Sequence, residues 1–357
     1  MKLQSNTEVI ERMLRMCKLV DPFWDRWQIH GMPMQEITAV RNTLHSVQDW
    51  TAGWTDVSRR WEKTAKEHRQ RQQLADAETA YRTASLASNL AQWLDPERNG
   101  NKLYNYRECI RLAKLADVCS PIETRYMELT VDRRLCAGRV RIPKNPIGSI
   151  ILVNPIDSNK EEMHTYEQDF LNSGYITLSF DGPGQGETFV MNQLRGTQNT
   201  WEQFINGVIA LSARLWIDLP IYLFGTSLGA TWALYGSSHA FVQKTAIVSP
   251  AVEFDRMHIP SYFLPRMGFS CSLDMEDMAL PSVQTMTFRK PIYLFHGQQD
   301  LMVPSQEIYN LFDRFPEGRK LREYANEGHC CNLQLNEIRK EVCDWFAASG
   351  MDEVNRI

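Results

Sequence analysis

The pattern of apolar and polar residues divides the chain into two parts. From about residue 7 to residue 115 the apolar positions recur with helical spacing, and only three prolines interrupt the stretch. From about residue 123 onward, short apolar runs alternate with helical segments, which is typical of a mostly parallel sheet covered by helices on both faces. We therefore predict a helical lid or dimerisation domain over residues 1–122 and an α/β domain over residues 123–357.

The first part of the chain is rich in tryptophan and alanine. Trp50, Trp54, Val57 and Trp61 fall on one face of a single helix, and an alanine-rich helix is expected over residues 74–94. The stretch contains six of the ten tryptophans: Trp24, Trp27, Trp50, Trp54, Trp61 and Trp93. They are interpreted chiefly as the core of a helical bundle. The alternative is that a few of them line a pocket for a flat apolar substrate.

The second part of the chain contains eight predicted strands. They cover residues 126–131, 136–142, 150–153, 175–180, 221–224, 245–248, 292–295 and 321–324, the first two forming a hairpin. Ligands of such sheets bind beyond the carboxyl ends of the strands, so the residues that follow each run are the candidates for chemistry. Residues 253–290 form an insertion rich in Met and Phe, which indicates either a lid over an apolar pocket or ordinary core filling.

The clearest chemical motif follows the fifth predicted strand. Residues 225–229 read G-T-S-L-G, and the segment after them has helical composition. A strand, a sharp turn and a helix present a serine hydroxyl above the sheet edge, and the flanking glycines let strand and helix cross closely. We predict Ser227 as a nucleophile and the backbone N–H of Leu228 as an oxyanion donor.

Partners for this serine follow the last two predicted strands. Serine attack needs an imidazole to accept the hydroxyl proton and a carboxylate to orient that imidazole. Asp300 follows the seventh strand and His329 the eighth, which gives the chain order Ser, Asp, His. His296 is interpreted as a structural group. Glu253 and Asp255, after the sixth strand, are rival candidates for the acid.

Two further turns at strand ends are expected near the serine. Ser158 and Glu161, after the third strand, have the spacing of a capping box and predict the start of a helix. The N–H of Ile156 in this turn is the predicted second oxyanion donor, unless the turn only caps that helix. After the fourth strand, residues 180–187 read F-D-G-P-G-Q-G-E and predict a tight loop in which Asp181 is structural.

Charge and composition exclude several classes of protein. The net charge is −4 with both signs interspersed, so we expect neither a nucleic acid nor a membrane as partner. Neither a signal-type apolar core at the N-terminus nor a run of roughly 18 apolar residues is present. The eight cysteines show no C-x-x-C spacing and are interpreted as free thiols. We therefore expect a cytoplasmic protein.

Several of these stretches together resemble one group of α/β-hydrolases. They are the helical first part, residues 157–162 (D-S-N-K-E-E), residues 180–187, residues 225–229 and residues 296–300 (H-G-Q-Q-D). The group contains the bacterial 2,6-dihydroxypseudooxynicotine hydrolase, fungal hydrolases that shorten polyketides in pigment pathways, and the fermentation/respiration switch esterases. The resemblance implies the α/β-hydrolase fold, a serine triad without metal, often a homodimer, and a pocket between the helical domain and the sheet.

The resemblance also implies roles for individual residues. Carried over by motif, Ser227 is the nucleophile, Asp300 orients His329, and the amides of Ile156 and Leu228 form the oxyanion hole. The chain departs from many relatives in having Asn-Pro at positions 154–155, where a glycine-rich turn is common.

Combining the residues with the resemblance predicts a cofactor-free serine hydrolase of secondary metabolism. Its substrate would be a bulky apolar, aromatic or polyketide-like small molecule, cleaved at a C–C bond beside a ketone or at an ester. We expect Asp157, Trp54, Met257 and Phe263 to contact it. The alternatives are an acyltransferase or cyclase that uses the same triad, and a non-catalytic binding protein on the same fold. A prolyl-oligopeptidase-like peptidase is disfavoured because the chain has no strand repeats of a propeller.

Overall fold

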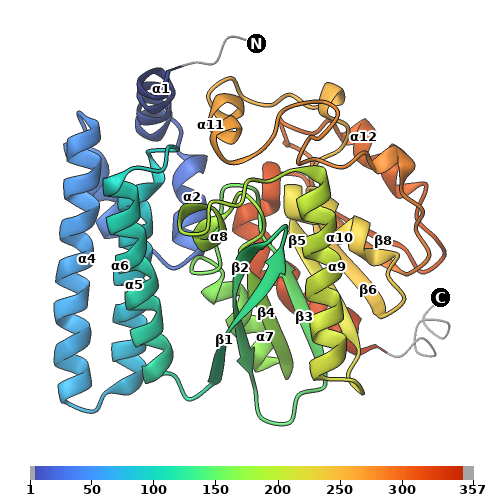
Figure 1. Cartoon of the computed structure of the whole chain (residues 1–357), viewed down its shortest axis with the longest axis horizontal. Coiled ribbons are helices and arrows are strands. Elements are labelled where there is room, and N and C mark those ends of the chain that lie inside the picture. The colour runs from blue at the N-terminus through green and yellow to red at the C-terminus, as the bar shows by residue number, and fades with distance from the viewer. Residues whose placement is uncertain (1–4, 349–357) are drawn as a thin grey trace.

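The computed structural model describes residues 5–348 and places a group of long helices beside a twisted sheet (Figure 1). The expectation that the N-terminus carries no signal-type apolar core falls partly on residues 1–4, which lie outside this range. Among the described residues, no helix has the length and apolar character required to cross a membrane.

Six helices precede the sheet in the described part of the chain. They are α1 (Asn6–Leu19), α2 (Pro22–Ile29), α3 (Met34–Thr43), α4 (Val47–Gln70), α5 (Leu74–Trp93) and α6 (Gly100–Cys119). The long helices α4, α5 and α6 run side by side at one end of the molecule, α2 lies between them and the sheet, and α1 stands at the top of the view (Figure 1). Local sequence sets the starts of α4 and α6, because Ser46 accepts a hydrogen bond from Asp49 N and Asn99 accepts one from Lys102 N.

The helical part has an apolar core of its own. The indole rings of Trp24, Trp27, Trp50 and Trp54 pack there and are at most 2% exposed. Trp50 Nε1 donates a hydrogen bond to Leu90 O, which ties α4 to α5. The bundle-core interpretation is therefore correct for these four tryptophans.

The eight strands in the described part of the chain form one sheet. They are β1 (Glu123–Val131), β2 (Arg134–Ile142), β3 (Gly148–Val153), β4 (Tyr175–Phe180), β5 (Ile221–Thr226), β6 (Val242–Val248), β7 (Ile292–Gly297) and β8 (Lys320–Tyr324). Their order is β1-β2-β4-β3-β5-β6-β7-β8, with antiparallel pairing of β2 to β1 and to β4 and parallel pairing elsewhere. The predicted fold class is confirmed.

Helices cover both faces of the sheet. Two helices, α7 (His164–Asn172) and α13 (Leu335–Ala347), pack on the face that carries Ile150 and Leu152. The opposite face, with Ile151 and Val153, is covered by α9 (Gln198–Leu215), α10 (Leu228–Ser237) and α12 (Ser305–Phe312). A short helix, α8 (Gly186–Val190), follows the Gly-rich loop after β4. Each central strand is buried on both faces, which explains its continuous apolar sequence.

The insertion between β6 and β7 lies over the top of the sheet in Figure 1. It contains helix α11 (Phe263–Ser270) between two short 3₁₀ helices, η1 (Phe254–Arg256) and η2 (Val283–Thr285). A third 3₁₀ helix, η3 (His329–Gln334), precedes α13. In the same view α11 faces α1 of the helical part.

The predicted capping box after β3 is wrong. No helix starts at Ser158, because the chain passes through consecutive turns and α7 begins only at His164. Ser158 Oγ instead donates a hydrogen bond of 3.0 Å to Glu162 Oε2. The glutamate itself is drawn into buried contacts with Arg26 and Asn89, which hold the chain in turns rather than in a helix.

Candidate active site

Ser227 occupies the sharp turn between β5 and α10. Its backbone angles are φ 55° and ψ −125°, a strained region for a residue with a side chain. The turn is stabilised by a hydrogen bond of 3.0 Å from Ser227 N to Val248 O on β6. A Cβ atom on Gly225 would lie 2.4 Å from Gly229 O, and one on Gly229 would lie 2.1 Å from Val153 O, so both positions require glycine.

The predicted imidazole and carboxylate both lie beside this serine. His329 Nε2 is 2.8 Å from Ser227 Oγ, and His329 Nδ1 is 2.8 Å from Asp300 Oδ2. The other oxygen of Asp300 accepts hydrogen bonds from the amides of Met302 and Val303, at 2.8 and 3.0 Å. The three side chains thus come from the ends of β5, β7 and β8 and meet at one edge of the sheet.

Burial and charge set the protonation of this pair. Burial raises the pKa of Asp300, but interaction with His329 and the two amide donors lowers it by more. Burial lowers the pKa of His329, yet its interactions with Cys330 and then with Asp300 outweigh burial and raise it well above the usual value. The neutral imidazole that can accept a proton is therefore formed on the alkaline side of the usual histidine range.

The rival residues take part in other contacts. Glu253 Oε1 accepts hydrogen bonds from Ser282 Oγ and Gln284 N, at 2.9 and 3.0 Å. Asp255 is exposed. His296 Nε2 lies 2.8 Å from the hydroxyl of a helix α12 residue, Ser305, as suits a packed structural group.

The two predicted oxyanion donors lie on either side of the serine. Leu228 is the first residue of α10, where backbone N–H groups have no partner within the helix. Ile156 is in the turn after β3 and lines the cavity above Ser227. Gln185, from the Gly-rich loop, donates from Nε2 to Asn154 O at 3.1 Å and to the Pro155 carbonyl at 2.6 Å, which fixes this turn.

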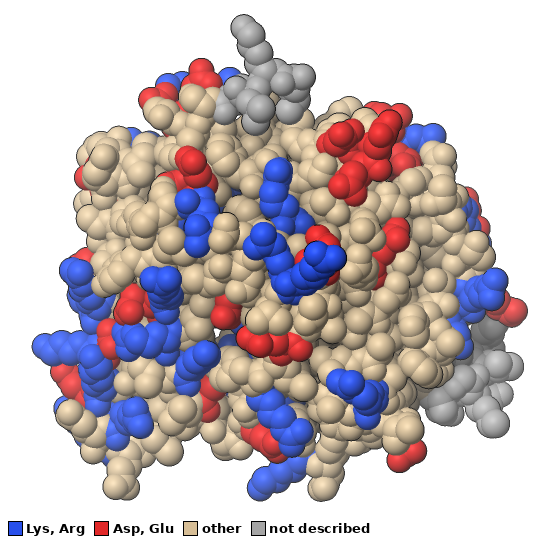
Figure 2. All heavy atoms as spheres, viewed as in Figure 1, with Lys and Arg blue, Asp and Glu red and all other residues tan. Residues whose placement is uncertain are grey.

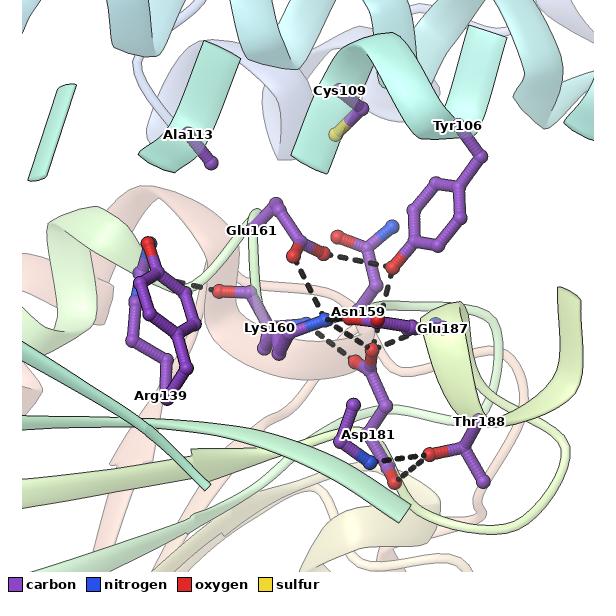
Figure 3. A network of polar contacts seen from close by, with 12 residues as sticks. Tyr106, Cys109, Ala113, Arg139, Asn159, Lys160, Glu161, Asp181, Glu187 and Thr188 are labelled. Carbon is purple, nitrogen blue, oxygen red and sulfur yellow. Dashed lines mark hydrogen bonds and ion pairs between the residues drawn. The ribbon is translucent and has the colours of Figure 1, made fainter. Parts of the chain in front are cut away.

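A buried charge network lies beneath the same turn (Figure 3). Lys160 Nζ is 2.8 to 2.9 Å from carboxylate oxygens of Glu161, Asp181 and Glu187. The hydroxyl of Tyr106 on α6 donates to Glu161 Oε2 at 2.8 Å and thereby joins the network to the helical part. Burial raises the pKa of Asp181 to about 6, although the Lys160 ammonium opposes this. One cation thus holds three carboxylates and one end of the turn.

A second set of charged contacts joins the turn to the helical part. Arg26 on α2 contacts Asp157 Oδ1 at 2.9 Å and Glu162 Oε2 at 2.7 Å. Asn89 on α5 donates to the other oxygen of Glu162 at 2.8 Å. The turn that carries Ile156 is therefore bound to α2, α5 and α6, so the helical part contributes to the geometry around the serine.

A cavity of about 180 Å³ opens above Ser227. Its wall combines residues of α1 and α2, the turn after β3, the insertion and the loop after β8: Met13, Met16, Pro22, Phe23, Arg26, His30, Trp93, Pro155, Ile156, Asp157, Tyr166, Thr226, Ser227, Pro260, Tyr262, Phe263, Met302, His329, Cys330 and Asn332. Most of these side chains are apolar or aromatic. The cavity lies between the helical part and the sheet, which is where the resemblance placed a pocket.

Two of the four predicted substrate contacts lie elsewhere. Asp157 and Phe263 line the cavity. Trp54 does not, because its ring is fully buried in the core of the helical part. Met257 packs on the core beneath the insertion and is absent from the cavity wall. Sequence reasoning missed Phe23, although the spacing of Phe23, Arg26 and His30 along α2 would have indicated that they share a face.

Comparisons with known proteins agree with this fold. No profile of a protein family matches the chain. The chain is 25% identical to the 2,6-dihydropseudooxynicotine hydrolase of Paenarthrobacter nicotinovorans, over 90% of both chains. A crystal structure of 2,6-dihydroxy-pseudo-oxynicotine hydrolase superposes with a TM-score of 0.75 at 22% identity and covers 90% of this chain and 94% of that chain.

Other solved structures share the fold at lower identity. AbyA5 superposes with a TM-score of 0.64 at 14% identity, over 94% of this chain and 97% of its own. The Pyrococcus furiosus esterase Pf2001 matches with a TM-score of 0.51 at 17% identity and covers 63% of this chain and 92% of its own. The resemblance to this group of α/β-hydrolases is confirmed, and the chain is an enzyme of the α/β-hydrolase type.

Proposed function

We propose that the chain is a serine hydrolase in which Ser227, His329 and Asp300 form the catalytic triad. The observation that carries this proposal is the pair of 2.8 Å contacts that link the serine hydroxyl to the imidazole and the imidazole to the carboxylate. Such an arrangement has a defined use in acyl transfer, whereas a binding protein on the same fold would have no need of it.

The first half of the proposed reaction makes an acyl-enzyme. Ser227 Oγ attacks the carbonyl carbon while its proton passes to His329 Nε2, and Asp300 stabilises the imidazolium that forms. The amides of Leu228 and Ile156 bind the negative oxygen of the tetrahedral intermediate. When the intermediate collapses, the bond to the leaving group breaks and His329 returns the proton to the departing carbon or oxygen.

The second half releases the acid. Water gives a proton to His329 and attacks the acyl carbon, and collapse of the second intermediate frees Ser227 with its proton restored. Overall, one water is consumed and one C–C or C–O bond is replaced by a carboxylic acid and a protonated leaving group. An acceptor other than water would turn the same acyl-enzyme into a transferase intermediate.

The wall of the cavity supports a bulky, apolar or aromatic substrate. Side chains such as Phe23, Trp93 and Phe263 offer ring faces, while Arg26 and Asp157 are charged groups at one side. The similar P. nicotinovorans enzyme is, by its name, a 2,6-dihydropseudooxynicotine hydrolase. We therefore favour cleavage beside an aryl ketone, with aryl esters as the convenient test substrates.

Covalent labelling tests the nucleophile. A fluorophosphonate probe should attach once per chain to the native enzyme and not at all to Ser227→Ala, with turnover of an aryl ester lost in parallel. Ser238→Ala, which changes an exposed serine at the other end of α10, should label like the native chain. Labelling that persists in Ser227→Ala would assign the nucleophile to another residue.

A further inference from the structure

A second, smaller cavity adjoins the cavity above Ser227. Its volume is about 60 Å³, which is room for a few heavy atoms, since by the same measure about 10–15 Å³ holds one water molecule. Trp93, Ile156, Asp157 and Phe263 line both cavities and form the wall between them. The other side of the second cavity is closed by the end of α5, by α6, by the Gly-rich loop and by α11.

Two buried cations from separate segments line this second cavity. Arg266 comes from α11 of the insertion and Lys102 from α6 of the helical part, and they are only 7% and 5% exposed. Arg266 Nη2 donates to Trp93 O at 2.6 Å, and its guanidinium lies 4.1 Å from the centre of the Trp93 ring. Lys102 Nζ donates to Gln92 Oε1 at 2.6 Å and to Asp95 O at 2.8 Å.

The hydrogen bonds of Arg266 and Lys102 compensate only part of their positive charge. Both cations contact carbonyls at the C-terminal end of α5, which carries the equivalent of about half a negative charge and so offsets only part of the charge of the guanidinium and the ammonium. The carboxylate of Asp157, which also lines the cavity, is engaged by Arg26 at 2.9 Å. Burial, and next to it the charge of Arg266, lowers the pKa of Lys102 to about 7. The cavity therefore has an excess of positive charge.

Two buried donors of residues that line the cavity, Trp93 Nε1 and Arg266 Nε, have no partner in the described part of the chain. A buried donor without a partner is costly, and each exception calls for an explanation. An anionic ligand would supply both an acceptor and the missing charge.

We propose that the second cavity is a substrate subsite that binds a carboxylate, with Arg266 as the direct ligand and Lys102 as a supporting charge. This rests on the proposed function of Ser227, because the carboxylate belongs to the molecule whose carbonyl lies above the serine. The substrate class is thereby narrowed to ketones or esters that carry an acidic side chain. To end beside Arg266, that side chain has to run past the shared lining residue Phe263.

Matched ester pairs test this subsite. The substrates are p-nitrophenyl half-esters of dicarboxylic acids of increasing length. Each is compared with an ester of the same length that ends in a neutral carboxamide, and the native enzyme is assayed with both. The ratio of the two kcat/KM values should favour the carboxylate by about tenfold or more at one length, since a buried charge-assisted hydrogen bond is worth at least that factor. A ratio near one at every length would overturn the proposal.

Variants assign the effect to the cavity. In Arg266→Met the preference for the carboxylate should vanish, and in Lys102→Met it should fall. Arg195→Met is the matched control, because Arg195 also donates to carbonyls of the α11 segment, those of Gly268 and Cys271, but lies outside the cavity wall. Retention of the full preference in Arg266→Met contradicts the proposal. The ratio does not depend on the amount of folded enzyme, so a destabilised variant still answers the question.

A binding measurement separates this subsite from the proposed chemistry. Binding is measured in Ser227→Ala, because this measurement needs no turnover. The dicarboxylate of the favoured length should raise the melting temperature of this variant, and its diamide should not. The shift should be lost in the double variant that also carries Arg266→Met. A shift without any esterase activity in the native chain would support the subsite and refute the triad. Activity without a shift would support the triad and refute the subsite.

Discussion

Gly229 at the start of α10 touches the backbone of Val153 at the end of β3. A Cβ atom on Gly229 would lie 2.1 Å from the carbonyl oxygen of Val153, and the next residue, Asn154, presents its own carbonyl at 2.5 Å. The helix that follows the proposed nucleophile therefore rests directly on the strand that leads to Ile156. This contact sets the distance between the two proposed oxyanion donors.

Gly229→Ala should separate these two elements. The new methyl group meets backbone atoms, which cannot rotate away, and overpacking of this kind costs about 1–3 kcal/mol of stability. Turnover of an aryl ester should also fall, and by more than the loss of folded protein explains, since α10 carries the Leu228 amide. Gly100→Ala, where a Cβ meets no atom within 4 Å, is the control for thermal melting and kinetics. Equal behaviour of the two variants would show that the close approach is not needed.

Asp300→Asn should retain the fold and lose most of the activity. An asparagine keeps the shape but presents the imidazole with the wrong partner, and in serine proteases the equivalent change lowers kcat by about 10⁴-fold. Glu253→Gln is the matched control, because Glu253 binds Ser282 and Gln284 instead of His329. Steady-state kinetics with melting curves checks both variants. A mild Asp300→Asn and a severe Glu253→Gln would move the acid to the end of β6.

The pH dependence of kcat/KM should report the raised pKa of His329. The base must be neutral to accept the serine proton, so activity should fall as the pH drops through that pKa. Because Cys330 and Asp300 together raise the pKa despite burial, we expect the midpoint of the acid limb to lie above pH 6.5, the usual value. Asp300→Asn removes the interaction of His329 with the Asp300 carboxylate and should shift the acid limb of the kcat/KM profile towards lower pH. A native midpoint at or below the usual value would contradict the charge arrangement.

The three residues of the proposed triad could be singled out in the sequence because each of them belongs to a short local pattern. Ser227 sits in a five-residue motif between a strand and a helix, while Asp300 and His329 each follow a strand. Parallel strands place their carboxyl ends at one edge, so residues far apart in the chain can be brought together without knowledge of any side-chain contact.

The supports of the site could not be predicted in this way. Arg26 pairs with Asp157 across 131 positions of the chain, and no local spacing relates the two. Helical periodicity correctly grouped Trp50 with Trp54 but did not indicate whether their face meets the bundle or the cavity. The capping box at Ser158 failed for the same reason, because distant buried charges outweighed a local preference.

Lys160→Met should destabilise the protein strongly. The lysine side chain is 2% exposed, and its removal leaves the carboxylates of Glu161, Asp181 and Glu187 without their shared cation. Breaking a buried ion pair from one side costs about 3–5 kcal/mol. Lys66→Met is the control, because the Lys66 side chain is 58% exposed and its loss should change the free energy of unfolding by less than about 1 kcal/mol. Chemical denaturation measures both, and a loss no larger than that of the control would refute a structural role for the network.

The last prediction distinguishes a cavity residue of the helical part from a core residue. Phe23 lines the cavity above Ser227, whereas Trp54 is fully buried among the other tryptophans. Phe23→Ala should lower kcat/KM for a large aryl ketone or ester by about tenfold, or 1.4 kcal/mol, and leave p-nitrophenyl acetate nearly unchanged. Trp54→Ala should cost about 3–5 kcal/mol of stability and reduce both activities together. If Phe23→Ala instead damaged both substrates equally, α2 would serve as scaffold, and the insertion would have to grip the substrate alone.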